Sequence, residues 1–174
     1  MKTFRSISPD DFNRSPFHLI NNDWMLITAE SGGRVNSMTA SWGGLGIMWG
    51  KKVSSIVLRP QRFTKVLLDE AETYSLSFLD HQKYARLLGY MGSVSGHDED
   101  KIKGSGVTVR HEQNTPFIEE ATTVILCRKL SRHHLGPDGF IDPTIDSTWY
   151  PNKDYHYLYL GEILDILDAS EVRQ

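Results

Sequence analysis

The stretch of residues 36–64 constrains the fold more than any other part of the chain. It contains hydroxyl residues, four glycines, an aliphatic segment and an arginine-proline pair, in the order NSMTASWGGLGIMWGKKVSSIVLRPQRFT. The aliphatic residues 53–58 are partly β-branched, which is typical of a strand. Pro60 suits the first position of a helix, because its φ is fixed and its missing N–H is not needed there. The stretch therefore predicts a strand, a turn built on Gly43, Gly44 and Gly46, a second strand, and a helix that begins at Pro60.

The start of that helix is a candidate anion site. The first N–H groups of a helix have no partner within it, and the helix dipole favours negative charge there. Arg59, Arg62 and Thr64 would lie within about one helical turn of these groups, and guanidinium groups bind phosphate in a bidentate manner. The alternative is a surface turn with two solvated arginines, which is the commoner meaning of an isolated R-P-x-R sequence.

Short apolar or alternating segments recur along the rest of the chain. Strands are predicted at residues 24–29, 73–79, 121–130 and 156–167, and helices or helical turns at residues 60–71, 84–91 and 98–103. Residues 1–16 are expected to form an N-terminal arm and residues 136–152 a loop. Many short strands with few helices favour an antiparallel barrel with helices outside it over a doubly wound sheet. No repeat or linker divides residues 1–174, so we expect a single domain.

Two details of packing follow from the spacing of apolar residues. Phe63, Val66 and Leu67 are spaced so that they share the inner face of the first helix. Residues 73–79 alternate between polar and apolar side chains, which predicts a strand that is buried on one face only.

Composition excludes several classes of protein. The chain has 174 residues, of which 39% are hydrophobic and 24% charged, a balance suited to a folded core. A net charge of −3 argues against nucleic-acid binding as the main task. Cys127 is the only cysteine, so no internal disulfide is expected, and its apolar neighbours indicate a packing role. No signal peptide and no membrane span of about 18 apolar residues is expected, so we expect a cytoplasmic protein without a membrane partner.

Two other kinds of ligand site are not expected. His133 and His134 are sequence neighbours that would point to opposite faces of a strand, and no histidine-carboxylate cluster has the spacing of metal ligands. No metal site is therefore predicted. The glycines at 43, 44 and 46 do not fit the G-x-G-x-x-G fingerprint of dinucleotide-binding folds.

Four short segments occur in a characteristic order. They read N-S-M-T-A-S-W at residues 36–42, R-P-Q-R-F-T at residues 59–64, S-G-H-D-E-D-K at residues 95–101 and H-Y-L-Y-L-G-E-I at residues 156–163. Together they resemble the flavin reductase-like family of FMN-binding split β-barrels. The resemblance implies a mainly β fold, an antiparallel split β-barrel with a few peripheral helices.

The resemblance also implies a set of cofactor contacts. The first segment would run along the isoalloxazine ring and the ribityl chain of FMN, the second would hold the phosphate, and the third would lie close to the cofactor. The histidine of the last segment opens its strand, where a ligand-facing side chain is expected to remain partly solvated, and it would face the nicotinamide side of the flavin. The residues expected to bind FMN are Asn36, Met38, Thr39, Ala40, Ser41, Trp42, Arg59, Arg62, Thr64, Ser95 and Lys101, and the expected catalytic residue is His156. A structural role is the alternative for the hydroxyls of Thr39 and Ser41 and for His156.

An FMN-dependent oxidoreductase of the flavin reductase type is the function that this resemblance implies. It would take hydride from NAD(P)H onto the bound flavin and pass electrons to oxygen, free flavin or an electron-accepting protein. A homodimer is expected, because small split barrels leave apolar surface that a second copy can cover. The alternatives are a flavoredoxin-like electron carrier that does not use nicotinamide and a non-enzymatic or haem-binding barrel.

Overall fold

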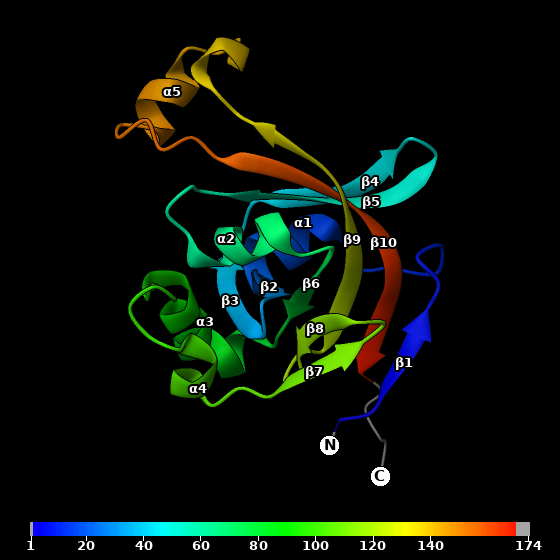
Figure 1. Ribbon diagram of the computed structural model, residues 1–174. Coiled ribbons are helices and arrows are strands. Elements are labelled where there is room, and N and C mark those ends of the chain that lie inside the picture. Colours follow the sequence, from blue (N-terminus) through cyan, green and yellow to red (C-terminus); the bar gives the residue numbers. More distant parts are fainter. Residues whose placement is uncertain (1, 170–174) are drawn as a thin grey trace.

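One antiparallel sheet of eight strands forms the body of the protein (Figure 1). The computed structural model describes residues 2–169. The strands of the main sheet are β1 (Phe4–Ile7), β2 (Met25–Ser31), β3 (Arg34–Ala40), β4 (Gly43–Met48), β5 (Lys51–Leu58), β6 (Thr73–Phe78), β9 (Thr123–His134) and β10 (Tyr157–Ala169). They are ordered β3-β2-β6-β9-β10-β5-β4, and β1 pairs with β10. This architecture confirms the expected mainly β, antiparallel fold.

A second hairpin and several short helices surround this sheet. The hairpin pairs β7 (Val109–Glu112) with β8 (Thr115–Ile118). The helices are α1 (Pro16–His18), α2 (Phe63–Glu70), α3 (His81–Ser93), α4 (Lys101–Ser105) and α5 (Thr144–Trp149), with a π-helix η1 (Leu19–Asp23) and a 3₁₀-helix η2 (Pro137–Gly139). None of the helices within residues 2–169 is both long and apolar enough to cross a membrane.

The sequence analysis missed two strands of the main sheet, β1 and β4, and both strands of the β7–β8 hairpin. Residues 43–48 form β4 and not a turn, because Gly43 lets this strand approach β5 closely: its φ is +148°, and a Cβ atom there would overlap the carbonyl oxygen of Ser55. Residues 4–7 of the expected N-terminal arm form β1, which adds to the edge of β10. In both places backbone pairing with another strand, β5 for β4 and β10 for β1, decides the structure, and local composition does not record it.

The first long helix begins three residues later than predicted. Pro60 lies in a turn that is closed by a hydrogen bond from the N–H of Arg62 to the carbonyl oxygen of Arg59 (3.1 Å). The fixed φ of proline suits the second position of such a turn as well as it suits a helix start. The prediction of which residues form the inner face of this helix was also partly wrong. Val66 is 41% exposed, whereas Leu67 and Leu68 are buried.

Strand β6 is buried on both faces, which corrects the prediction of a half-buried strand. The β7–β8 hairpin covers the face that carries the serines. Ser75 Oγ donates to the carbonyl oxygen of Pro116 (2.6 Å), and Ser77 Oγ accepts from the N–H of Ile118 (3.2 Å). The buried hydroxyls of both serines therefore form hydrogen bonds with β8, and this allows the polar residues of the alternating pattern to lie inside the protein.

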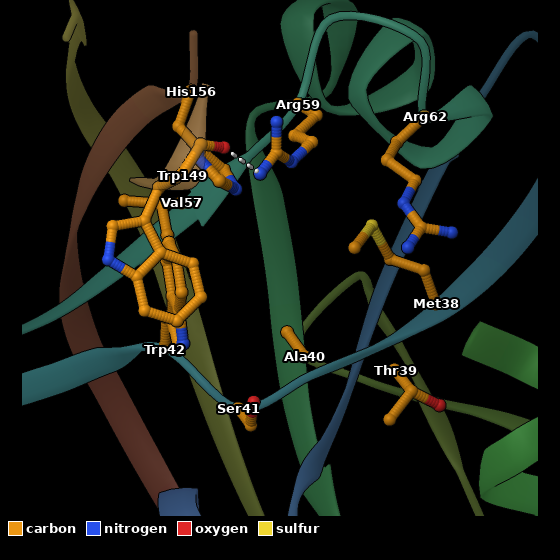
Figure 2. Close-up of a pocket in the computed structure, with 10 residues that line it drawn as sticks. All are labelled: Met38, Thr39, Ala40, Ser41, Trp42, Val57, Arg59, Arg62, Trp149 and His156. Atoms are coloured by element: carbon orange, nitrogen blue, oxygen red, sulfur yellow. Dashed lines mark hydrogen bonds between the residues drawn. The ribbon is translucent and has the colours of Figure 1, made fainter. Parts of the chain in front are cut away.

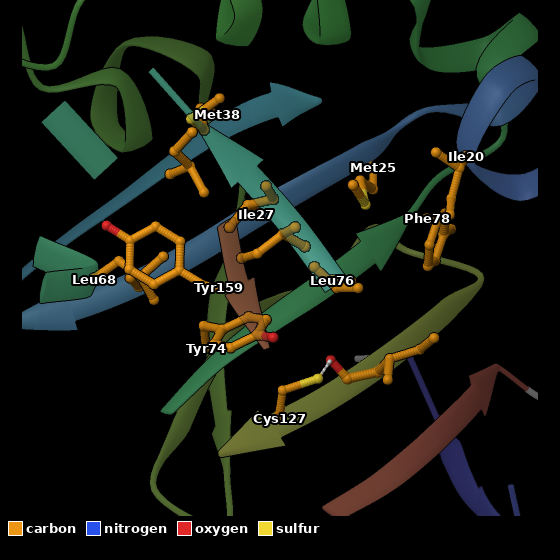
Figure 3. Packing of buried hydrophobic residues seen from close by; sticks show 14 of the residues in the cluster. Ile20, Met25, Ile27, Met38, Leu68, Tyr74, Leu76, Phe78, Cys127 and Tyr159 are labelled. Atoms are coloured by element: carbon orange, nitrogen blue, oxygen red, sulfur yellow. Dashed lines mark hydrogen bonds between the residues drawn. The ribbon is translucent and has the colours of Figure 1, made fainter. Parts of the chain in front are cut away.

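Side chains on the two faces of the sheet belong to different hydrophobic clusters. Met25 and Ile27 of β2 pack in one cluster with Tyr74 and Cys127, while Leu26 packs in the other beneath α3 and the β7–β8 hairpin (Figure 3). Cys127 is fully buried, which confirms its predicted packing role, and burial raises the pKa of its thiol to about 12. The segments that carry the candidate site therefore lie over a closely packed core.

Residues 136–155 connect β9 to β10 as an arm that projects away from the barrel (Figure 1). The sequence analysis expected a loop, and the arm also contains η2 and α5. Phe140 stacks on Tyr150 with ring centroids 5.6 Å apart, and Tyr150 contacts Tyr155 at 4.9 Å. This aromatic packing gives the arm a small core of its own. We refer to residues 136–155 as the arm.

Candidate functional site

Two adjacent cavities lie beside β3 and the end of β5, and they share Met38, Arg59 and Arg62. The Trp42 cavity, of about 190 Å³, is also lined by Thr39, Ala40, Ser41, Trp42, Val57, Trp149 and His156 (Figure 2). The Lys101 cavity, of about 430 Å³, is also lined by Asn36, Gln61, Phe63, Thr64, Gly92, Ser93, Val94, Ser95, Gly96 and Lys101. Every residue that the sequence analysis placed at the site lines one of these two cavities.

Two of the three cations that line the Lys101 cavity, Arg62 and Lys101, are held by the end of α3. Lys101 is only 2% exposed, and its Nζ donates to the carbonyl oxygen of Met91 (2.8 Å). Arg62 Nη1 donates to the carbonyl oxygen of Gly92 (2.6 Å). Both acceptors lie near the C-terminal end of α3, where helix carbonyls lack partners and the dipole attracts positive charge. The end of α3 thus holds both cations in place.

These cations have no anionic partner of their own. Within residues 2–169, no carboxylate forms an ion pair with Arg62 or Lys101. Burial, and to a smaller extent the charge of Arg62, lowers the pKa of Lys101 to about 8. Two like charges held in a partly desolvated site raise its free energy, and an anion between them would lower it. The electrostatics of this cavity indicate an anionic ligand.

The start of α2 adds backbone donors to the same cavity. No side chain caps the first turn, whose N-cap residue is Arg62. The N–H of Lys65 donates to the carbonyl oxygen of Arg62 (2.9 Å), so the N–H groups of Phe63 and Thr64 are the donors that an anion could meet. Thr64 is fully buried, and its hydroxyl accepts a hydrogen bond from Asn36 Nδ2 (2.8 Å). The predicted roles of this pair are therefore modified: Thr64 fixes Asn36 as a wall of the cavity, in addition to any contact with a ligand.

Gly96 keeps the opposite wall open. A Cβ atom at this position would lie 2.7 Å from both Asn36 Oδ1 and the ring of Phe63. The N–H of His97 donates a hydrogen bond to the hydroxyl of the neighbouring Ser95 (3.1 Å), and this bond shapes the loop before α4. The S-G pair of the third sequence segment thus forms a close-fitting turn against β3 and α2.

The Trp42 cavity is walled by aromatic rings. Trp42 follows β3, and its ring meets Trp149 of the arm edge-on with centroids 4.9 Å apart. His156 lies 5.2 Å from Trp42 on the same side (Figure 2). Such walls suit a flat, apolar ligand.

Arg59 joins this aromatic wall to the barrel. Its Nη2 donates to the carbonyl oxygen of Trp149 (2.8 Å), as Figure 2 shows, and its Nη1 forms an ion pair with Asp154 Oδ1 (2.6 Å). Gln61 Nε2 donates to the other carboxylate oxygen of Asp154 (2.8 Å). Arg59 therefore borders both cavities, but its own hydrogen bonds go to the arm.

His156 is a neutral imidazole in this setting. It is buried at the start of β10, where the sequence analysis expected a partly solvated side chain, because the arm covers it. Its Nδ1 shares a hydrogen bond with the Tyr150 hydroxyl (2.8 Å). Burial lowers the pKa of His156 to about 4, and the positive charge of Arg59 acts in the same direction. When Tyr150 is the donor, Nε2 carries the proton of the neutral ring.

The hydroxyl run of β3 divides between structural and cavity positions. Ser37 is fully buried and shares a hydrogen bond with Thr28 (3.0 Å). Thr39 and Ser41 both line the Trp42 cavity, together with Met38 and Ala40. Thr39 Oγ1 also donates to the carbonyl oxygen of Leu88 (2.6 Å), which ties β3 to α3.

Sequence reasoning missed the contribution of the arm to the site. Trp149, Tyr150 and Asp154 were not assigned to it, although all three contact Arg59 or His156. The run W-Y-P-N-K-D-Y-H-Y at residues 149–157 is unusually aromatic for a loop, and that composition was the available signal.

Comparison with known proteins gives a consistent result. Residues 17–173 match the family model described as a flavin reductase like domain, and no curated protein matches the chain. The structure resembles an FMN-binding domain of a flavin reductase-like enzyme from Shewanella baltica (16% identity, 97% of this chain and 78% of that one, TM-score 0.70). It also resembles a flavoredoxin from Methanosarcina acetivorans (20% identity, 87% of this chain and 69% of that one, TM-score 0.66). A third similar structure is that of an FMN-binding protein from Thermus thermophilus with bound p-hydroxybenzaldehyde (22% identity, 97% of this chain and 84% of that one, TM-score 0.67). These likenesses confirm the split-barrel fold.

Proposed function

Because the chain belongs to the flavin reductase-like family, we propose that it is an FMN-binding oxidoreductase whose flavin takes hydride from NAD(P)H and passes electrons to an acceptor. The observation that carries the proposal is a pair of cations, the half-buried Arg62 and the buried Lys101, beside an aromatic-walled cavity. An elongated ligand with an anionic end and a flat end matches this arrangement, and FMN is such a molecule.

The donor set fits FMN at each part of the cofactor. Arg62, Lys101 and the first turn of α2 would hold the phosphate. Thr39 and Ser41 would meet ribityl hydroxyls, and Trp42 would border the isoalloxazine ring. Gly96 lets the loop before α4 pack closely against Asn36 and Phe63, and this packing would fix the wall of the Lys101 cavity.

When bound, FMN would supply the capacity to accept hydride and transfer electrons. The protein then has to bind the cofactor, orient it and limit the access of water. We propose that His156 acts as a neutral donor that positions the nicotinamide, since its low pKa keeps it uncharged at neutral pH. Tyr150 fixes the orientation of its ring through Nδ1. Arg59 holds the arm so that Trp149 stays beside Trp42.

We also propose a homodimer. The tip of the β4–β5 hairpin exposes three large apolar side chains in sequence, Ile47, Met48 and Trp49, and contiguous exposed apolar surface commonly marks an interface. Light scattering tests this directly: Trp49→Ser should lower the measured mass from two chains to one. A monomeric wild-type protein that still binds FMN would contradict the proposal.

A flavoredoxin-like electron carrier is the second candidate, and the likeness to the Methanosarcina acetivorans flavoredoxin favours it. Stopped-flow mixing of the FMN-loaded protein with NADH and with NADPH separates the two functions. A reductase should lose its flavin absorbance rapidly with at least one of them. A carrier should stay oxidised with both and be reduced only by a protein donor.

The electron acceptor in this proposal can be a small molecule. The Thermus thermophilus neighbour holds p-hydroxybenzaldehyde, so we include aromatic compounds among the acceptors proposed for this chain, beside oxygen, free flavin and an electron-accepting protein.

A further inference from the structure

A third cavity lies on the other side of Trp42 from the candidate flavin site. It has a volume of about 410 Å³ and is formed by the α1–η1 segment and by residues 41–45, where the chain passes from β3 to β4. Its apolar walls are Pro16, Phe17, Ile20, Trp42 and Leu45. Ser41 and Trp42 line this cavity and the Trp42 cavity alike, so the two cavities share a wall.

The third cavity differs from the other two in charge. None of the side chains that line it is charged, and its polar groups come from Asn21 and Ser41 and from the backbone. The Trp42 and Lys101 cavities, in contrast, contain Arg59 and Arg62, and the latter also contains Lys101. An anionic or dinucleotide ligand would therefore gain nothing from the third cavity, whereas a neutral aromatic molecule would bury apolar area there.

Backbone lines one side of the cavity. Gly43 and Gly44 present no side chain there, and a Cβ atom at Gly43 would overlap the carbonyl oxygen of Ser55 on the neighbouring strand β5. On the opposite side, Phe17 is 87% exposed although its ring borders the opening. The result is a recess with a backbone floor and a phenyl ring at its rim that a ligand could cover.

We propose that this recess binds a neutral aromatic molecule of one or two rings. The volume is within the range of small-molecule pockets, the walls are apolar, and the recess shares the wall formed by Ser41 and Trp42 with the candidate flavin site. Its role as the site of the electron acceptor rests on the proposed function. The binding itself does not, because the remaining apolar walls, Pro16, Phe17, Ile20 and Leu45, lie outside the candidate flavin site.

Isothermal titration calorimetry with two probes tests the proposal. The probes are 2-naphthol, which is neutral at pH 7, and naphthalene-2-sulfonate, which has a similar ring system and a negative charge. Each is titrated into the protein saturated with FMN and into the flavin-free protein. We expect 2-naphthol to bind in both cases, and at least tenfold more tightly than the sulfonate when FMN fills the cationic cavities.

Two variants locate the binding. Phe17→Ala should weaken 2-naphthol about fivefold by removing apolar contact and leave FMN affinity unchanged. Ile141→Ala, at a fully exposed apolar position on the arm, is the matched control and should change neither. Both side chains are exposed, so neither substitution threatens the core.

Three results would overturn the proposal: no binding of 2-naphthol, tighter binding of the sulfonate with FMN present, or no effect of Phe17→Ala. If a second copy of the chain covers the recess instead, wild-type protein will not bind 2-naphthol, and Phe17→Ala will lower the mass measured by light scattering. A protein that binds 2-naphthol in this way but fails to bind FMN would refute the proposed function and leave the recess assignment standing.

Discussion

Arg59 Nη1 lies 2.6 Å from Asp154 Oδ1, and this ion pair fastens the arm to the barrel next to the start of α2. The same guanidinium donates to the carbonyl oxygen of Trp149 and lies over the ring of Tyr150, with 5.2 Å between Cζ and the ring centroid. Arg62, only three residues away, is turned toward the end of α3 instead. The two arginines of the R-P-x-R sequence therefore have different surroundings, and we expect different effects when they are replaced.

Arg62→Ala should weaken FMN binding about tenfold or more and change riboflavin binding little, because a charge-assisted hydrogen bond to phosphate contributes roughly 1.5–3 kcal/mol. Arg59→Ala should weaken both flavins, since it also releases the arm that walls the Trp42 cavity. Titration of each variant with FMN and with riboflavin, followed by flavin fluorescence, measures how much each substitution weakens the binding of either flavin. Equal losses of FMN and riboflavin in Arg62→Ala would remove the phosphate assignment.

Binding of FMN should weaken as the pH rises through about 8. The pKa of Lys101 is lowered to about 8, so its side chain is charged below that pH and loses its proton, and its attraction for phosphate, above it. The affinity for FMN measured from pH 7 to 9.5 should fall, while that for riboflavin should stay nearly constant. Lys101→Met should abolish the pH dependence, and Lys103→Met, an exposed position on the same helix, should preserve it. A wild-type affinity that does not change over this range would show that Lys101 does not meet the phosphate.

His156→Ala should slow reduction of the bound flavin by NAD(P)H and leave FMN affinity nearly unchanged, the pattern of a residue that acts on hydride transfer. Tyr150→Phe removes the hydroxyl that orients the imidazole and should slow reduction by a smaller factor. Stopped-flow reduction and equilibrium FMN titration of both variants distinguish the cases. Loss of FMN with a normal rate in the remaining loaded protein would make His156 a cofactor-binding or structural residue.

Gly161→Ala should lower the free energy of unfolding by about 1–3 kcal/mol, the usual cost of overpacking a core. A Cβ atom there would overlap the hydroxyl of Tyr74, which is fully buried and hydrogen-bonded to Ser54 Oγ (2.7 Å). Gly46→Ala, in β4 with no heavy atom within 4 Å of the added carbon, is the control and should change stability by no more than about 0.5 kcal/mol. Urea unfolding of the three proteins tests this, and equal midpoints for all of them would refute the packing argument.

The strands and the cavity-lining residues were predictable because they carry strong local signals. Apolar segments marked β2, β5 and β9, and the four sequence segments placed Asn36, Arg62 and Lys101 at one site. Their register with one another follows from backbone pairing, so that residues far apart in the chain converge on the same two cavities.

The features that were missed depend on contacts between distant segments. Strand β4 forms because Gly43 can approach Ser55, and the serines of β6 are buried because β8 supplies their partners. Likewise, the partial solvation expected for His156 was wrong because the arm covers it. In each case a partner elsewhere in the chain changes the meaning of a local pattern, and one sequence does not reveal that partner.

The central claim is that this protein binds FMN through a cationic cavity that recognises the phosphate. Titration of the flavin-free protein with FMN and with riboflavin, followed by flavin fluorescence and absorbance, tests it most directly. The account predicts saturation at one FMN per chain and an affinity for FMN at least about tenfold higher than that for riboflavin. Riboflavin binding as tightly as FMN, or a protein that binds neither flavin and carries a haem Soret band as purified, would contradict it.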